Sequence, residues 1–289
     1  MTHHWSGHRS LIEATGGSIL DGVHSVGELV ADLRTLGIGS GDVVMIHASL
    51  RAVGPVEEGA VGVVHAVEQA VGATGTLLMN LGARDDFDWV NDRPEPERAG
   101  LLADAVPFDK DLTPADPDVG VLAEVFRRLA GTVVNDHPDA RFGARGPLAR
   151  ALLDEPLPWD DYYGSGSVLD RFVRTQGKIL RLGADPDTVT LLHLAENLVE
   201  LPTKRRVVRH HQVLSSDGTG RTRTVRCLDD TDGIVDWPGE DYFVVILQDY
   251  LHTRRASIGR IGNAPSELID SVDFLDFSVT WMRTHFRRQ

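Results

Sequence analysis

Val43-Val-Met-Ile-His47 and Thr76-Leu-Leu-Met79 are short apolar runs of the kind that form buried strands. Between them, residues 60–71 carry apolar side chains at helical spacing, and Gly72 and Gly75 bracket the turn into the second run. An order of strand, helix and strand predicts a crossover unit in which the two strands pair in parallel. The sequence therefore predicts an α/β fold: a mixed sheet with helices on both faces, in three layers.

Local patterns predict further elements on both sides of this unit. A capping box at Ser25-Val-Gly-Glu28 begins a helix that Gly37 ends. Further helices are predicted at 121–129, 147–153, 188–200 and 265–286, and further strands at 178–182, 206–209, 222–228 and 242–246. No shift of composition marks a boundary, so we expect one domain over residues 1–289.

Residues 85–118 differ from the rest of the chain in charge. They hold eleven acidic and three basic side chains together with five prolines. This composition predicts a long loop, and we expect an acidic loop region at 81–118 that covers the site. A surface loop that only confers solubility is the alternative.

The composition of the whole chain limits its partners and its compartment. The 289 residues carry a formal net charge of −14, which argues against nucleic acid or an anionic membrane as the main partner. The charge fits a cationic partner or plain solubility. A single cysteine, Cys227, excludes an intrachain disulfide framework, and no apolar stretch is long enough for a membrane helix. We expect a cytoplasmic protein, and the sequence leaves open whether it forms a homodimer.

A few polar residues stand where an α/β protein places a site. His193 follows a predicted strand and a Gly/Asp/Pro turn, and Glu196 lies three positions later on the same helical face. His137 precedes a proline, and His47-Ala-Ser49-Leu-Arg51 directly follows a strand. Each pattern has a structural alternative: a core histidine, a turn histidine and a plain tight turn. The sequence shows neither a zinc-binding His-x-x-x-His motif nor a usable nucleophile elbow.

The order and spacing of several segments resembles the aminoglycoside 3-N-acetyltransferase family over roughly residues 25–245. The strongest segment is Gly183-Ala-Asp-Pro-Asp-Thr-Val-Thr-Leu-Leu-His-Leu-Ala-Glu196. Further segments are His47-Ala-Ser-Leu-Arg-Ala-Val-Gly54, Gly75-Thr-Leu-Leu-Met79, Gly120-Val-Leu-Ala-Glu-Val-Phe-Arg127, His137-Pro138, Phe142-Gly-Ala-Arg-Gly-Pro147 and Gly164-Ser-Gly-Ser167. The resemblance implies acetyl-CoA-dependent acetylation of an amine, the 3-amino group, of an aminoglycoside antibiotic, with resistance as the result.

The resemblance also implies roles for individual residues. His193 would be the general base, and its carboxylate partner would be Glu196, Asp230 or Asp232, among which the sequence does not choose. Coenzyme A would contact the turn formed by His47, Ala48, Ser49, Leu50, Arg51 and Val53. The cationic substrate would contact Asp85, Asp86, Asp88, Glu124 and His137. No metal is expected.

Two other functions remain open at this stage. The first is acetylation of a different amine, such as a biosynthetic intermediate. The second is a non-catalytic protein that binds cationic antibiotics in an acidic cleft.

Overall fold

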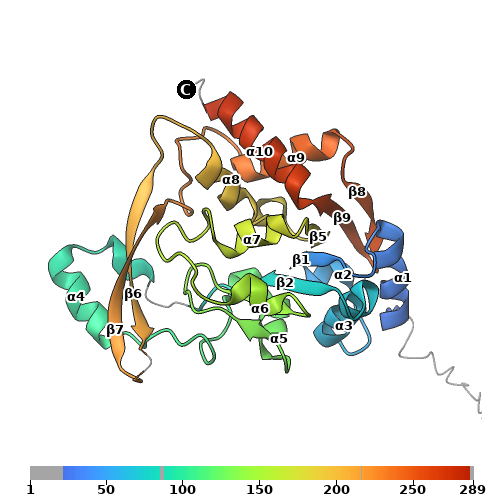
Figure 1. The fold of residues 1–289 in the computed structure, drawn as a ribbon, viewed down its shortest axis with the longest axis horizontal. Helices are drawn as coiled ribbons and strands as arrows, with labels where there is room; N and C mark the ends of the chain where they lie inside the picture. Colours follow the sequence, from blue (N-terminus) through green and yellow to red (C-terminus); the bar gives the residue numbers. More distant parts are fainter. Residues whose placement is uncertain (1–21, 85–87, 216, 287–289) are drawn as a thin grey trace, which may run out of the picture.

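The computed structural model describes residues 22–84, 88–215 and 217–286. At its centre is a seven-stranded sheet with the order β3-β4-β2-β1-β5-β9-β8 (Figure 1). Its strands are β1 (Val43–Ala48), β2 (Thr76–Asn80), β3 (Val133–Val134), β4 (Phe142–Arg145), β5 (Lys178–Leu182), β8 (Ser257–Ile261) and β9 (Ala264–Asp270). β1 pairs in parallel with β2 and with β5, whereas the outer strands pair antiparallel. The sheet is mixed, as predicted.

The central strands carry apolar side chains on both faces because alternate residues of a strand point to opposite sides. On β1, Val43 and Met45 join one hydrophobic cluster, whereas Val44 and Ile46 join the other. The second cluster packs against α1 (Val26–Leu36), α3 (Ala60–Val71) and α5 (Val121–Arg128). The first cluster includes α6 (Ala149–Leu153), α7 (Val168–Arg174), α8 (Leu192–Leu198), α9 (Tyr242–His252) and α10 (Ser271–His285). The three-layer α/β prediction is confirmed.

A two-stranded ribbon stands beside this core (Figure 1). It consists of β6 (Arg206–Leu214) and β7 (Gly220–Leu228), which pair antiparallel over their whole length. The chain that follows β7 returns toward α8 and connects to α9 through residues 229–241. The residues around this return form part of the candidate site.

The segment predicted as a long loop contains regular structure. It holds the 3₁₀ helix η1 (Asp88–Asp92), the helix α4 (Glu95–Asp104) and the 3₁₀ helix η2 (Pro117–Val119). η1 and α4 contact β6, and Phe108 exchanges main-chain hydrogen bonds with Gln212 and Leu214. The prediction of an irregular segment was therefore wrong for these stretches, because Pro96 suits the first turn of a helix and Leu102 supplies a buried contact.

Two other predictions of local structure were wrong. The apolar run at 242–246 begins a helix, α9, because Asp241 accepts a hydrogen bond from the Phe243 amide and caps it. The helix predicted at 265–286 begins only at Ser271, since residues 264–270 form β9 between β5 and β8. The shorter α2 (Leu50–Val53) follows β1 directly.

Candidate active site

His193 lies on the helix that follows the carboxyl end of β5. Gly183 turns the chain out of β5 with φ of 60°, and a Cβ atom there would lie 2.4 Å from Ala52. Only glycine fits this turn, which leads through the 3₁₀ helix η3 (Pro186–Thr188) into α8. His193 occupies the first turn of α8, with 18% of its side chain exposed.

The His193 ring is held between a carboxylate and two aromatic rings. Its Nδ1 atom lies 2.8 Å from Oε2 of Glu196, one turn further along α8. The Tyr163 ring stacks on it with 4.8 Å between centroids and 9° between planes, and Phe243 contacts it at 4.9 Å. Because Glu196 accepts the proton on Nδ1, Nε2 is left as the nitrogen available to a substrate.

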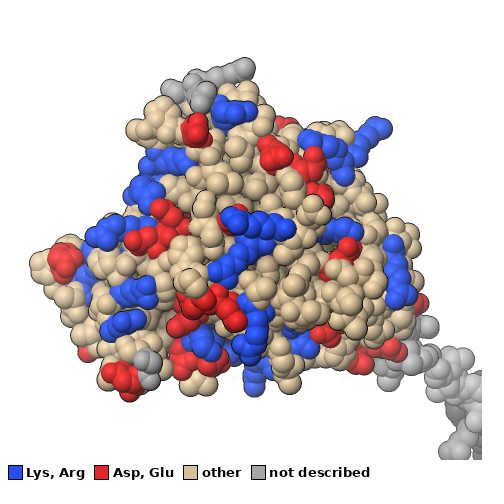
Figure 2. Space-filling model, viewed as in Figure 1, with Lys and Arg blue, Asp and Glu red and all other residues tan. Residues whose placement is uncertain are grey.

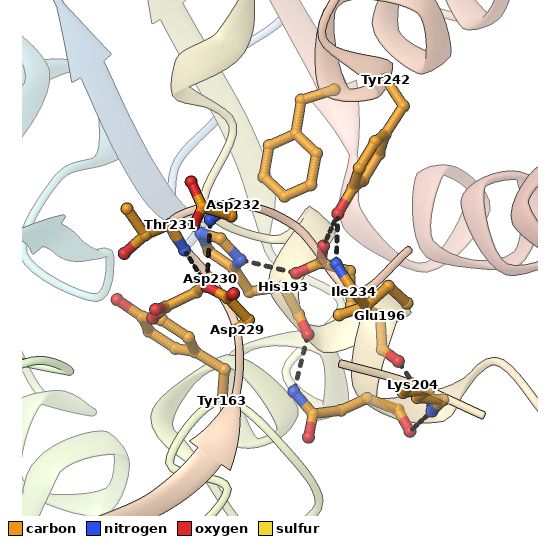
Figure 3. Close-up of polar contacts among 12 residues, drawn as sticks. Tyr163, His193, Glu196, Lys204, Asp229, Asp230, Thr231, Asp232, Ile234 and Tyr242 are labelled. Carbon is orange, nitrogen blue, oxygen red and sulfur yellow. Dashed lines mark hydrogen bonds and ion pairs between the residues drawn. The ribbon is translucent and has the colours of Figure 1, made fainter. Parts of the chain in front are cut away.

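Glu196 is almost completely buried, with 1% of its surface exposed. One carboxylate oxygen faces His193, and the other accepts a hydrogen bond from the hydroxyl of Tyr242 (Figure 3). Among the three carboxylates considered as partners of the base, Glu196 is the one in hydrogen-bond contact with His193.

The surroundings of His193 raise its pKa above the ordinary value of 6.5. Burial of the ring acts to lower the pKa, but the hydrogen bond and charge of Glu196 and the charge of Asp230 outweigh it. A raised pKa makes the imidazole a stronger proton acceptor toward an amine than an ordinary histidine.

Two cavities meet at His193. The first, the acidic cavity, has a volume of about 490 Å³ and is lined by Asp187, His193, Glu196, residues 230–233, Val235, Trp237 and residues 239–243. The second, the strand-end cavity, has a volume of about 740 Å³ and lies over the ends of β1, β2 and β5. Asp187, His193 and Phe243 line both. Two bound molecules could therefore approach the same imidazole from different sides.

The strand-end cavity is lined by the turn between β1 and α2 and by the start of α5. Residues 46–51 and 118–122 contribute to its wall. The first amides of a helix lack acceptors within the helix, so the starts of α2 and α5 offer N–H groups to an anion. The exposed Arg51 side chain adds a positive charge.

His47 contributes a neutral imidazole to this wall. It is 8% exposed, and burial together with the charge of Arg181 lowers its pKa to about 3. Its Nε2 atom is buried without a hydrogen-bond partner. Val53, in contrast, is fully buried in the hydrophobic core, and it is absent from the lining of the cavity.

The acidic cavity contains carboxylates of two kinds, one engaged by neighbouring side chains and others exposed to solvent. Asp230 is held in place, because one oxygen lies 2.6 Å from Arg209 and the other accepts a hydrogen bond from Tyr162 at 2.7 Å. Asp187, Asp232 and Glu240 are exposed to the cavity. Asp230 therefore shapes the charge around His193, whereas the exposed carboxylates are open to a cationic molecule.

Three of the predicted substrate contacts cannot be placed as side chains. Asp85 and Asp86 lie outside the described residues, and Asp88 is described only as the first residue of η1.

Glu124 and His137 are engaged within the protein. Glu124 forms a two-pronged ion pair with Arg127 and accepts the Ala115 amide, which together lower the pKa of Glu124 to about 2. His137 is 3% exposed, and both ring nitrogens are hydrogen-bonded to main-chain groups. This geometry gives no support to a substrate contact at either residue.

Several residues of the site were not predicted from the sequence. Asp187 lies within the segment that resembles the family, and its place between a strand and a helix was a usable signal. Tyr163, Tyr242 and Phe243 come from distant segments, so only the fold brings them to His193. Within the described ranges, no three His, Cys, Asp or Glu side chains are grouped as metal ligands.

A histidine paired with a buried carboxylate between two cavities fits a group-transfer enzyme that binds two molecules. A family model described as aminoglycoside 3-N-acetyltransferase matches residues 45–283. The chain belongs to the aminoglycoside 3-N-acetyltransferase family, as the sequence resemblance indicated.

Individual relatives agree with this assignment. Aminoglycoside N(3)-acetyltransferase VIII of Streptomyces fradiae is 38% identical over 282 residues, which cover 96% of each chain. The crystal structure of the aminoglycoside acetyltransferase AAC(3)-Xa is 36% identical, with a TM-score of 0.87 over 93% of this chain and 96% of that one. AAC-IIIb, solved as a binary complex with CoASH, is 34% identical with a TM-score of 0.85 over 91% and 97% of the two chains.

Proposed function

We infer that this enzyme transfers the acetyl group of acetyl-CoA to an amine, the 3-amino group, of an aminoglycoside, and so confers resistance to the antibiotic. The observation that carries the inference is the position of His193. Its ring is paired with the buried Glu196 and lines both the acidic cavity and the strand-end cavity.

We propose that acetyl-CoA occupies the strand-end cavity. The N–H groups at the starts of α2 and α5, and the charge of Arg51, suit the phosphate groups of the coenzyme. The cavity extends to His193, so the thioester would lie beside the base. The resemblance that assigns residues 47–51 to the coenzyme is consistent with this placement.

The aminoglycoside would occupy the acidic cavity. It carries several ammonium groups, and the exposed carboxylates of Asp187, Asp232 and Glu240 complement this positive charge. These carboxylates hold the ammonium groups and do not compete with the amine as nucleophiles. Asp230, which the sequence offered as a partner of the base, instead contributes through its negative charge near His193.

The reaction requires one proton to leave the attacking amine. The amine nitrogen forms a bond to the thioester carbonyl carbon while its proton passes to Nε2 of His193, and Glu196 stabilises the resulting imidazolium. The carbon–sulfur bond then breaks, and the proton is returned from the imidazolium to the sulfur of coenzyme A. The products are an amide and a free thiol, so atoms and charge balance.

Product analysis tests this function. The purified protein is mixed with acetyl-CoA and each of several aminoglycosides, and free thiol is measured while mass spectrometry reads the product. We expect one acetyl group per antibiotic and one thiol per acetyl group. Tight antibiotic binding without thiol release would instead indicate a sequestering protein, and acetylation of other amines only would indicate a biosynthetic enzyme.

We also propose a cytoplasmic location, because the reaction consumes acetyl-CoA, which cells hold in that compartment. In the described part of the chain, no helix is both long and apolar enough to cross a membrane. Cell fractionation tests the location, and sedimentation of the purified protein tests whether it forms a homodimer.

A further inference from the structure

Tyr242 lies at the start of α9 with its hydroxyl turned toward the catalytic pair (Figure 3). The residue is 6% exposed. Its ring contacts those of Trp237, Phe243 and Phe286, with centroids 6.4, 5.3 and 5.2 Å away. These contacts, together with the Asp241 cap of α9, fix the direction in which the hydroxyl points.

The hydroxyl of Tyr242 forms two hydrogen bonds with opposite roles. It accepts a hydrogen bond of 3.2 Å from the main-chain amide of Ile234, which can only donate. It therefore has its proton free to donate to the second carboxylate oxygen of Glu196. Ile234 lies between Gly233 and Val235, which line the acidic cavity, so a chain of hydrogen bonds joins that wall to the base.

Glu196 depends on this donor because it is buried. Lys204 is close, but its ammonium group donates to the main-chain oxygens of Glu196 and Asn197 at 2.8 and 2.9 Å. Within the described residues, the donors to the Glu196 carboxylate are therefore His193 and Tyr242. A buried carboxylate oxygen that loses its donor is left without a hydrogen-bond partner, which costs free energy and frees the carboxylate to turn.

We propose that Tyr242 is a positioning residue for the acetyl transfer: its hydroxyl holds one oxygen of Glu196 so that the other stays aimed at His193, and it couples this pair to the wall of the acidic cavity. The inference rests on the proposed function, in which His193 is the base. Without the hydroxyl, the pair of His193 and Glu196 would hold its shared proton more tightly, so less of the base would be free at neutral pH.

Other charged and titratable groups face the same pair and contribute to its titration. They come from the segment before α7, from β6, from η3 and from the stretch after β7: Tyr163, Arg209, Asp187, Asp230, Asp232 and Asp241. A substitution that leaves all of them in place isolates the contribution of the Tyr242 hydroxyl.

The variant Tyr242→Phe provides this test, because it removes one oxygen atom and leaves the ring contacts. We expect the acid limb of the kcat/KM profile to move to higher pH by about half a unit or more. At pH 7 we expect kcat to fall about threefold and to recover toward the wild-type value near pH 9. The KM for acetyl-CoA should stay within about twofold, since Tyr242 lines only the acidic cavity.

Tyr250→Phe is the matched control. Tyr250 lies on the same helix, is fully buried, and donates a hydrogen bond of 2.7 Å to the carboxylate of Asp273, away from both cavities. We expect this variant to keep the wild-type pH profile. An equal shift in both variants, or no shift in Tyr242→Phe, would overturn the proposal.

A second variant keeps the test decisive if Tyr242→Phe folds poorly. A Cβ atom at Gly233 would lie 2.8 Å from the Tyr242 hydroxyl, and the φ of 79° there also strains an alanine, so Gly233→Ala moves the loop and that oxygen apart. We expect a shift in the same direction, and an unchanged profile in this variant would contradict the proposal. Absence of turnover in the wild-type protein would refute the proposed function itself, which is a different result.

Discussion

His47, His137 and His193 are all largely enclosed by the protein but differ in their nearest charged neighbour. His47 and His137 have pKa values of about 3 and about 4, chiefly because burial disfavours the charged ring. His193 is also enclosed, yet its pKa is raised, because Glu196 lies 2.8 Å from Nδ1. A carboxylate at hydrogen-bond distance thus raises the pKa of a histidine that burial alone would keep neutral.

His137→Ala tests the structural role of that histidine. Its Nδ1 accepts the amides of Asp139 and Ala140, so the substitution leaves two buried N–H groups without an acceptor. We expect a loss of about 3 kcal/mol in the free energy of unfolding at pH 8, with the KM for aminoglycoside within about twofold. Chemical denaturation and steady-state kinetics measure the two quantities.

The loss should also depend on pH in a defined direction. The folded state holds His137 neutral down to about pH 4, whereas the unfolded state takes up a proton near pH 6.5. The wild-type contribution is therefore complete above pH 6.5 and decreases as the pH falls toward 4. A rise in KM for the antibiotic at unchanged stability would instead favour a substrate contact.

Residue spacing alone placed His193 and Glu196 on one face of a helix, but it could not separate the proposed catalytic pair from a structural pair. His193 and Glu196 are three positions apart on α8, and Glu124 and Arg127 have the same spacing on α5. Both pairs form, but only the first pair lines a cavity, and its histidine lies where the acidic cavity and the strand-end cavity meet. Burial and contacts with distant segments distinguish the two pairs, and the local sequence predicts neither.

At the level of elements, the sequence predicted the strands of the parallel core well. The centres of β1, β2 and β5 are apolar, and a glycine lies one or two positions before each strand, at Gly41, Gly75 and Gly177. The prediction failed at residues 242–246 because aromatic and β-branched residues favour a strand, whereas packing against the core made them helical. The prediction failed at 265–270 because these residues pair with β5 and β8 and therefore form a strand where a helix start was expected. The pairing with β5 joins segments that are distant in the sequence.

The boundary between β9 and α10 therefore depends on a cap. The Asp270 carboxylate accepts hydrogen bonds from the amides of Val272 and Asp273, both at 2.9 Å. Asp270→Ala should lower the free energy of unfolding by about 1 kcal/mol, because these amides lose their acceptor. Denaturation curves measure the loss, and kcat should not change.

Asp276→Ala is a suitable comparison, since Asp276 is exposed within the same helix. We expect its effect on stability to be within about 0.5 kcal/mol of zero. Equal effects of the two variants would show that the cap does not determine where α10 begins.

At the level of the whole molecule, the net charge of −14 is not spread as a uniform acidic surface. Figure 2 shows acidic and basic side chains close together on the face that it presents. The exposed carboxylates of the acidic cavity, in contrast, line the same cavity as His193. Attraction of a polycationic substrate should therefore act through the cavity rather than through the overall charge.

Ionic strength tests this attraction. Between about 20 mM and about 300 mM NaCl, kcat/KM for the aminoglycoside should fall roughly tenfold, because salt screens the exposed carboxylates. Asp232→Asn should make this dependence shallower, whereas Asp276→Asn should not, since Asp276 lies on α10 and does not line the cavity. A salt dependence that is the same in all three proteins would argue against a role of Asp232 in binding.

The most direct measurement is turnover of His193→Ala, with acetyl-CoA binding measured in the same preparation. Removal of the imidazole should lower kcat by a factor of about 10² to 10⁴, because the attacking amine then loses its proton acceptor. The dissociation constant for acetyl-CoA should stay close to the wild-type value. Turnover equal to that of the wild-type enzyme would contradict the assignment of His193 as the base.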